Sequence, residues 1–249
     1  MLSFDNLSAG YGPCNVLQAV SGRAQSGELI ALIGPNGSGK STLLKTLCGI
    51  VPARGGTVTL GQTPLTKIAL KTRARQIAYL GQSREAMPAM SARQVITLGR
   101  APYRGALGKI STTGELVIKS AIARTQSESF MARRFDSLSG GEQARVLLAR
   151  ALAVGAPVLL ADEPIAALDP FYQITMMEIL KAEAKAGQLV ICALHDLSLA
   201  AGFADRIWVM NEGRIVQNGT PAKTLSAKTL KTVFGIKAPK DGFSGVSLA

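Results

Sequence analysis

The sequence is poor in the residues that build disulfide frameworks and zinc sites. Its 249 residues include 3 cysteines and 1 histidine. Cys14, Cys48 and Cys192 lie far apart and form no CxxC pair, so neither kind of site is expected. Acidic residues are also scarce, because 16 Asp and Glu stand against 28 Lys and Arg, for a net charge of +12. This excess suits anionic partners such as nucleotides, nucleic acid or anionic lipid head groups.

Long hydrophobic runs are missing too. A membrane span requires about 18 uninterrupted apolar residues, and the best candidate, residues 146–161, is broken by Arg150 and Pro157. The first five residues lack the basic and then apolar layout of a signal peptide. A hydrophobic content of 47% nevertheless allows a sizeable core and excludes intrinsic disorder. These features predict a soluble cytoplasmic protein.

Short apolar runs alternate with longer helical patterns, which indicates an α/β architecture. We expect strands at residues 2–7, 28–33, 77–80, 158–161, 189–193 and 207–210, and antiparallel strands next to turns at 55–60 and 214–217. Four of the runs are almost continuously apolar, as a buried parallel sheet requires. Helices are expected to begin at Gly39, Ser91, Gly140 and Pro170. Residues 91–135 contain no strong strand and predict a helical lobe.

Residues 34–42 read GPNGSGKST and stand between the apolar run 29–33 and a helical pattern. A G-x-x-x-x-G-K-S loop in this context is typical of phosphate binding, because small residues let successive backbone N–H groups face phosphate oxygens. In such a loop Lys40 reaches the β- and γ-phosphates, and the Ser41 hydroxyl binds Mg²⁺. A glycine-rich turn could match the pattern by chance, but the flanking strand and helix favour a nucleotide site.

Two carboxylates, Asp162 and Glu163, follow the apolar run 158–161. An acid at the carboxyl end of a strand beside a phosphate loop commonly binds Mg²⁺, and this role suits Asp162. Glu163 would point to the other side, where it could polarise an attacking water. Alone, the two could equally be exposed acids at a strand end. Beside the phosphate loop, the catalytic interpretation is favoured.

Residues 138–143 read LSGGEQ and lie between the phosphate loop and the two carboxylates. This segment, with the RVLLARAL of residues 145–152, closely resembles the signature of the ATP-binding cassette (ABC) ATPases. The resemblance covers about residues 2–234. It implies a single ABC ATPase domain, residues 1–249, of α/β class. Its P-loop NTPase (RecA-like) core would carry an antiparallel β subdomain and an inserted α-helical subdomain at about residues 88–155.

Four more residues match family elements in the expected order. Tyr11 matches the aromatic residue that stacks on adenine, and Gln82 matches the loop glutamine that senses the γ-phosphate and faces the membrane partner. Asp169 belongs to the loop that crosses the dimer interface, and His195 matches the switch histidine. A surface tyrosine in an exposed turn, an ordinary loop glutamine and a core histidine are the alternatives, and the family order favours the functional roles.

The resemblance implies ATP and Mg²⁺ as ligands and a head-to-tail dimer, in which the LSGG segment of one copy contacts the γ-phosphate held by the other. The expected nucleotide-binding residues are Tyr11, Gly34, Pro35, Asn36, Gly37, Ser38, Gly39, Lys40, Ser41, Thr42, Gln82, Ser139, Gly140, Gly141, Glu142, Asp162, Asp169 and His195. The expected catalytic residues are Lys40, Gln82, Glu163 and His195. The expected metal ligands are Ser41, Gln82 and Asp162.

One phosphate loop and one LSGG segment, without a membrane span or room for a long coiled coil, favour the separate ATP-hydrolysing subunit of a membrane importer. Residues 99–103, GRAPY, resemble an element of cassettes that serve iron-siderophore, haem and cobalamin importers, although a generic helix end before a proline would look similar. We expect a homodimer bound to integral membrane permease subunits at the cytoplasmic face of the inner (plasma) membrane. A substrate-binding protein would be an indirect partner.

Two alternatives stay open: a zinc or manganese importer ATPase, and a soluble ABC ATPase that acts on nucleic acid or ribosomes. Basic residues cluster at 67–75 and scatter from 223 onwards, without the interleaved aromatic residues that stack on bases. A solvated face near anionic lipid explains this charge better, so no nucleic-acid partner is expected.

Overall fold

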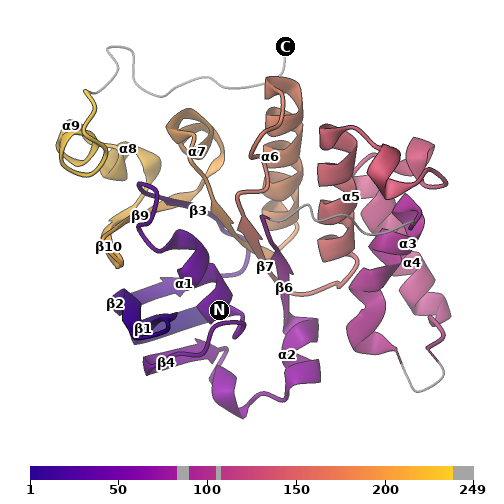
Figure 1. Ribbon diagram of the computed structural model, residues 1–249, viewed down its shortest axis with the longest axis horizontal. Coiled ribbons are helices and arrows are strands. Elements are labelled where there is room, and N and C mark those ends of the chain that lie inside the picture. Colours follow the sequence, from indigo (N-terminus) through magenta and orange to yellow (C-terminus); the bar gives the residue numbers. More distant parts are fainter. Residues whose placement is uncertain (83–89, 105–107, 238–249) are drawn as a thin grey trace.

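A mostly parallel sheet forms the centre of the molecule (Figure 1). The computed structural model describes residues 1–82, 90–104 and 108–237. The sheet has the order β10-β9-β3-β8-β7-β6, with β3 (Leu29–Ile33), β6 (Ile77–Leu80), β7 (Val158–Asp162), β8 (Leu189–Ala193), β9 (Arg206–Asn211) and β10 (Arg214–Gly219). Among these described strands, only β10 pairs antiparallel. Every residue of β3, β7 and β8 is buried, which explains their continuous apolar runs.

A smaller antiparallel sheet has the order β2-β1-β4-β5 and consists of β1 (Leu2–Tyr11), β2 (Cys14–Ala24), β4 (Gly55–Leu60) and β5 (Thr63–Pro64). The sequence does not indicate β2, because its buried and exposed residues do not alternate as they do in a regular strand. The alternation is lost where the register against β1 shifts, which happens several times along the pair. β1 also extends beyond the predicted residue 7. Tyr11 is therefore the last residue of a strand, directly before the hairpin turn rather than within it.

The helices pack on both faces of the central sheet. They are α1 (Lys40–Leu47), α2 (Leu70–Gln76), α3 (Ala92–Thr97), α4 (Thr112–Arg124), α5 (Gly140–Leu152), α6 (Pro170–Lys185), α7 (Leu197–Phe203), α8 (Pro221–Thr224) and α9 (Ala227–Thr229). The short helical turns are η1 (Leu65–Lys67), η2 (Leu98–Tyr103), η3 (Glu128–Phe130), η4 (Phe135–Ser137) and η5 (Leu230–Phe234). The predicted starts agree with the structure, since Gly39 and Ser91 are N-caps and Gly140 and Pro170 are first helical residues.

The described residues form two separate hydrophobic cores. One lies between the two sheets and includes α1, and the other joins the opposite face of the central sheet to helices such as α5 and α6. Trp208, the single tryptophan, is fully buried in the first core. Its ring meets that of Phe4 edge-on, with 5.5 Å between centroids. This contact joins β9 of the central sheet to β1 of the smaller sheet.

Helices α3, α4 and α5 pack together at one side of the molecule, away from the antiparallel sheet (Figure 1). Between residues 91 and 135, the described part of the chain contains helices, turns and one isolated bridge, Ser91 to Arg134, in line with the expected helical lobe. The proposed start of this subdomain, residue 88, lies outside the described residues. No helix in the described ranges has both the length and the apolar content needed to span a bilayer.

Candidate active site

The phosphate loop and the expected catalytic residues converge at the carboxyl edge of the central sheet, where four neighbouring parallel strands end. The phosphate loop follows β3, Gln82 lies beyond β6, Asp162 ends β7 and His195 follows β8. Ligands of open α/β sheets bind outside the carboxyl ends of the strands. The topology therefore brings together residues that are up to about 160 positions apart in the sequence.

The phosphate loop, residues 34–42, connects β3 to α1 and includes the first three residues of that helix. A Cβ atom at Gly34 would lie 2.2 Å from the Met210 carbonyl oxygen on β9, so only glycine fits there. Gly39, the N-cap of α1, has a φ of 101°, which favours glycine. The loop thus presents the unpaired N–H groups at the start of α1, where anions bind.

Lys40 is buried and lies inside the curve of the loop. Its ammonium donates hydrogen bonds to the carbonyl oxygens of Gly34 at 2.8 Å and Pro35 at 3.1 Å. Burial lowers the pKa of Lys40, while the negative charges of Glu163 and Asp162 oppose that shift. The cation is thereby held beside two carboxylates and can compensate the charge of phosphate oxygens.

Asp162 is 1% exposed and accepts hydrogen bonds from two hydroxyl groups. Ser41 Oγ lies 2.8 Å from Oδ1, and the Tyr79 phenol lies 2.9 Å from Oδ2. Burial, with a smaller contribution from the Asp162 charge, raises the pKa of Tyr79, so the phenol stays protonated and donates. Tyr79 was not predicted from the sequence, where its signal was a polar-tipped ring in an otherwise apolar strand.

Glu163 follows directly and has different partners. Its backbone is left-handed, with a φ of 52°. Oε1 lies 2.5 Å from His195 Nε2, and Oε2 accepts a hydrogen bond from Gln82 Nε2 at 2.7 Å. The three predicted residues Gln82, Glu163 and His195 thus form one connected group. Tyr79 of β6 thus holds Asp162, and Gln82, two residues beyond the end of that strand, holds Glu163.

A cavity of about 280 Å³ lies between the phosphate loop and Glu163. It is lined by Val16, Asn36, Gly37, Ser38, Gly39, Lys40, Ser41, Thr42 and Glu163. The Ser38 hydroxyl is buried there without a hydrogen-bond partner among the described residues. An oxyanion would satisfy this hydroxyl and the Lys40 ammonium, so the residues fit the phosphates of ATP. A larger cavity of about 610 Å³ near Met1, Gln76 and Pro157 has no carboxylate among the described residues that line it.

The three expected metal ligands do not all lie together. Ser41 and Asp162 are hydrogen-bonded to each other, whereas the Gln82 amide is bonded to Glu163. No group of three or more acidic, histidine or cysteine side chains able to hold a metal occurs within the part of the chain that the structure describes. Mg²⁺ commonly uses one or two carboxylates together with phosphates and water, so a hydroxyl and a carboxylate beside a phosphate site fit this ion.

Tyr11 lies outside the cavity lining, at the end of the hairpin between β1 and β2, and its side chain is exposed. Arg54 binds the same hairpin from the segment before β4. Its guanidinium donates to the carbonyl oxygens of Gly12 and Cys14 and to Asn15 Oδ1. These contacts fix the turn that carries the expected adenine-stacking residue.

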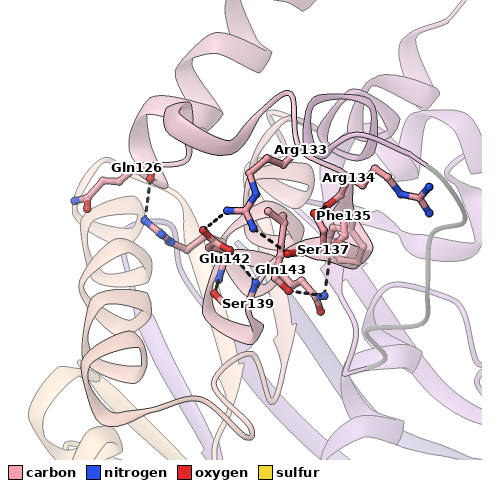
Figure 2. Close-up of polar contacts among 10 residues, drawn as sticks. Gln126, Arg133, Arg134, Phe135, Ser137, Ser139, Glu142 and Gln143 are labelled. Carbon is pink, nitrogen blue, oxygen red and sulfur yellow. Dashed lines mark hydrogen bonds and ion pairs between the residues drawn. The ribbon is translucent and has the colours of Figure 1, made fainter.

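The LSGGEQ segment forms the start of α5. Ser139 Oγ accepts from the Glu142 N–H, and Glu142 Oε2 accepts from the Ser139 N–H, which is a capping box (Figure 2). Arg133 forms an ion pair with Glu142 at 2.9 Å. The Ser139 N–H and this arginine hold the pKa of Glu142 below its usual range. Glu142, expected to bind nucleotide, is thus engaged within its own helix start.

Two further expected residues stand at helix starts: Gly141 is in the first turn of α5, and Asp169 directly precedes α6. A Cβ atom at Gly141 would lie 2.6 Å from the Tyr172 ring, so close packing alone already requires glycine. Asp169 is the N-cap of α6, and its side chain makes no capping bond within the described structure. Over the described ranges, no hydrogen bond joins the LSGG segment to the phosphate loop of the same chain.

Comparison with known proteins gives the same assignment. The ABC transporter family model matches residues 17–166. The hemin import ATP-binding protein HmuV of Streptomyces coelicolor is 41% identical over 88% of this chain and 78% of its own length. The iron(3+)-hydroxamate import ATP-binding protein FhuC of Bacillus subtilis is 32% identical over 95% and 88%.

Among solved structures, a dimeric post-hydrolysis state of the ATP-binding cassette MJ0796 bound to ADP and Pi matches with a TM-score of 0.78. Its identity to this chain is 27%, and the match covers 89% of this chain and 99% of that one. The phosphate loop, the two carboxylates and the LSGGEQ helix start therefore occur in the fold that the sequence predicted. This chain belongs to the ABC transporter family and is an ATP-binding-cassette ATPase.

Proposed function

We propose that this chain hydrolyses ATP to power a membrane importer, of the class that takes up iron-siderophore, haem or cobalamin. The observation that carries the proposal is the position of Glu163. Its carboxylate lines the phosphate-loop cavity and is held there by His195 and Gln82. The relatives named for hemin import and for iron(3+)-hydroxamate import support this class of cargo.

ATP would occupy this cavity, with its β- and γ-phosphates against the N–H groups of the loop and the Lys40 ammonium. Ser41 and Asp162 would hold Mg²⁺, which when bound neutralises charge on the phosphate oxygens. The exposed Tyr11 ring is available to stack on the adenine base. The buried Ser38 hydroxyl, which has no partner among the described residues, supports this placement.

Glu163 would act as the general base that accepts a proton from the attacking water. Gln82 and His195 occupy one carboxylate oxygen each, and this fixes the plane of the carboxylate. The His195 side chain is 46% exposed, so it can also reach a γ-phosphate bound in front of Glu163. Gln82 and His195 would therefore position the Glu163 carboxylate and also face the bound nucleotide.

A second copy of the chain would complete the site. Ser139 and Gly141 at the start of α5 would contact the γ-phosphate held by the other copy, because the first N–H groups of a helix can bind an anion. Asp169, the N-cap of α6, would lie in the loop that crosses the dimer interface. The dimeric state of the similar cassette MJ0796 supports this arrangement. In an importer, such a dimer would bind permease subunits at the cytoplasmic face of the inner (plasma) membrane and depend indirectly on a substrate-binding protein.

The test of the catalytic assignment is Glu163→Gln. This variant should bind ATP as tightly as the wild type and lose about 10²- to 10⁴-fold in turnover, because the amide cannot accept the proton. It should also form an ATP-dependent dimer, visible by light scattering. Glu178→Gln, exposed on α6, is the matched control and should keep full turnover. Full turnover by Glu163→Gln would refute the assignment.

The importer role is tested with the same variant in a pull-down from solubilised native membranes with MgATP. A membrane permease retained in equal amount would support the proposal, and its identity would separate metal-chelate cargo from zinc or manganese. Ribosomal or nucleic-acid components without a permease would overturn the transport role and leave the ATPase assignment intact.

A further inference from the structure

The phenol of Tyr79 contacts the carboxylate that the site offers to a metal. Tyr79 lies on β6 opposite Leu160 of β7, two residues before Asp162. Residues two apart on a strand share one face, so Tyr79 lies on the same face of the sheet as Asp162. Its hydroxyl donates to Oδ2 at 2.9 Å, and Asp162 itself is 1% exposed.

Tyr79 is itself held in place. Its ring packs against the core that includes α1, and the half-buried side chain has little freedom to turn. Gly81 also lies close to the ring, since a Cβ atom there would be 3.2 Å from Tyr79 Cε1. The phenol oxygen is therefore fixed relative to both the sheet and the segment that leads to Gln82.

The two oxygens of the Asp162 carboxylate have different hydrogen-bond donors. Ser41 donates to Oδ1 and can still offer an oxygen lone pair to a cation. Tyr79 donates to Oδ2. The carboxylate plane is thereby set with Oδ1 beside Ser41, and partners of metal ligands in such positions orient the ligand and raise metal affinity.

We infer that Tyr79 is a positioning residue for Mg²⁺, which holds Asp162 so that its Oδ1 and the Ser41 hydroxyl face the ion together. The inference rests on the proposed function, because it concerns the metal of the ATP site. Tyr79 would not touch the ion or the nucleotide and would act through Asp162 alone.

The experiment measures binding of a fluorescent ATP analogue to the full chain, without turnover, in EDTA and at increasing free Mg²⁺. Tyr79→Phe keeps the ring and removes the hydroxyl. It should raise the Mg²⁺ concentration for half-maximal enhancement of binding by about 10- to 100-fold, the usual effect of losing such a partner. Binding in EDTA should equal that of the wild type, because Tyr79 does not contact the nucleotide.

Two controls separate positioning from packing. Tyr103→Phe alters a tyrosine of η2 whose ring stacks on Arg100, whereas the hydroxyl groups that donate to Asp162 are those of Ser41 and Tyr79. This variant should leave the Mg²⁺ dependence unchanged. In an Asp162→Asn background, Tyr79→Phe should add no further shift, because the two residues act together. A thermal unfolding curve establishes that Tyr79→Phe is folded.

The outcomes are distinguishable. A Tyr79→Phe midpoint equal to that of the wild type would overturn the inference and leave the ATP site standing. An equal loss of binding with and without Mg²⁺ would also overturn it, since that result reports lost packing. Wild-type protein that binds no ATP analogue under any condition would instead refute the proposed function.

Discussion

Gly34 and Gly37 of the phosphate loop differ in what a methyl group would meet. At Gly34 it would lie 2.2 Å from the Met210 carbonyl oxygen, while at Gly37 no atom of the described residues lies within 4 Å. Gly34→Ala should therefore prevent the loop from closing on β9 and abolish ATP binding. Gly37→Ala should only strain a residue whose φ is 78°, at a cost of about 1 kcal/mol.

Urea unfolding and binding of a fluorescent ATP analogue check this pair. The expected result is a folded Gly37→Ala variant with a small loss of stability and a Gly34→Ala variant that no longer binds. Equal behaviour of the two would show that contact with β9 does not constrain the loop.

At the residue scale, motif spacing predicted part of the site and missed another part. Ser41 and Asp162 are 121 positions apart, and the chemistry of phosphate loops alone predicted that they act on the same ion. Tyr79 could not be found in this way, because its bond to Asp162 depends on the register between β6 and β7. No local pattern in a continuously apolar strand encodes that register.

At the scale of elements, the GRAPY segment closes the end of α5. Arg100, in η2, donates hydrogen bonds from Nη1 to the carbonyl oxygens of Ala153 and Val154, each at 3.0 Å, and its guanidinium stacks 3.7 Å from the Tyr103 ring centroid. A Cβ atom at Gly99 would lie 2.2 Å from the Arg150 carbonyl oxygen. The segment is thus explained by helix packing, whatever the cargo.

Arg100→Leu should lower the free energy of unfolding by about 2 kcal/mol, because the buried carbonyl group of Ala153 and the partly buried one of Val154 lose a charged donor. Urea titration followed by circular dichroism measures the change. Arg93→Gln is the control: this arginine pairs with Glu115 at an exposed position on α3, and its loss should change stability by less than about 0.5 kcal/mol. A comparable loss in both variants would contradict the capping role.

Elements were predictable where burial is uniform. Strands β3, β7 and β8 are buried at every residue, so apolar runs marked them in the sequence. β2 lies in the smaller sheet with irregular register, and its exposed and buried positions follow no period. Its place depends on pairing with β1, which tertiary contacts decide.

At the scale of the whole molecule, an ion pair links the helical lobe to the core. Arg124 of α4 and Glu183 of α6 lie 2.5 Å apart, and the Glu183 side chain is 6% exposed. Burial raises the pKa of Glu183, and the Arg124 charge opposes this shift only in part. In the folded protein the ionised form is therefore disfavoured relative to the unfolded chain.

The sign of the pH dependence follows. A carboxyl group whose pKa is raised on folding binds its proton more readily in the folded state, so its ionisation destabilises the protein above that pKa. Glu183→Gln should be more thermally stable than the wild type at pH 7, and the difference should shrink as pH falls through the raised pKa towards 4.5. Thermal unfolding at several pH values measures it.

Glu178→Gln, at an exposed position of the same helix, should not change the unfolding midpoint at pH 7. A Glu183→Gln variant that is less stable than the wild type at pH 7 would show instead that Arg124 outweighs the cost of burial.

The two cores also divide the spectroscopic signals of the protein. Trp208 lies between the two sheets, whereas α3, α4 and α5 contribute to the other core. Tryptophan fluorescence thus reports on the core between the two sheets, whereas the helices of the lobe contribute far-ultraviolet circular dichroism and pack in the other core. If fluorescence and circular dichroism are recorded in one urea titration, coincident unfolding transitions would show that the sheets and the lobe unfold as a single cooperative unit.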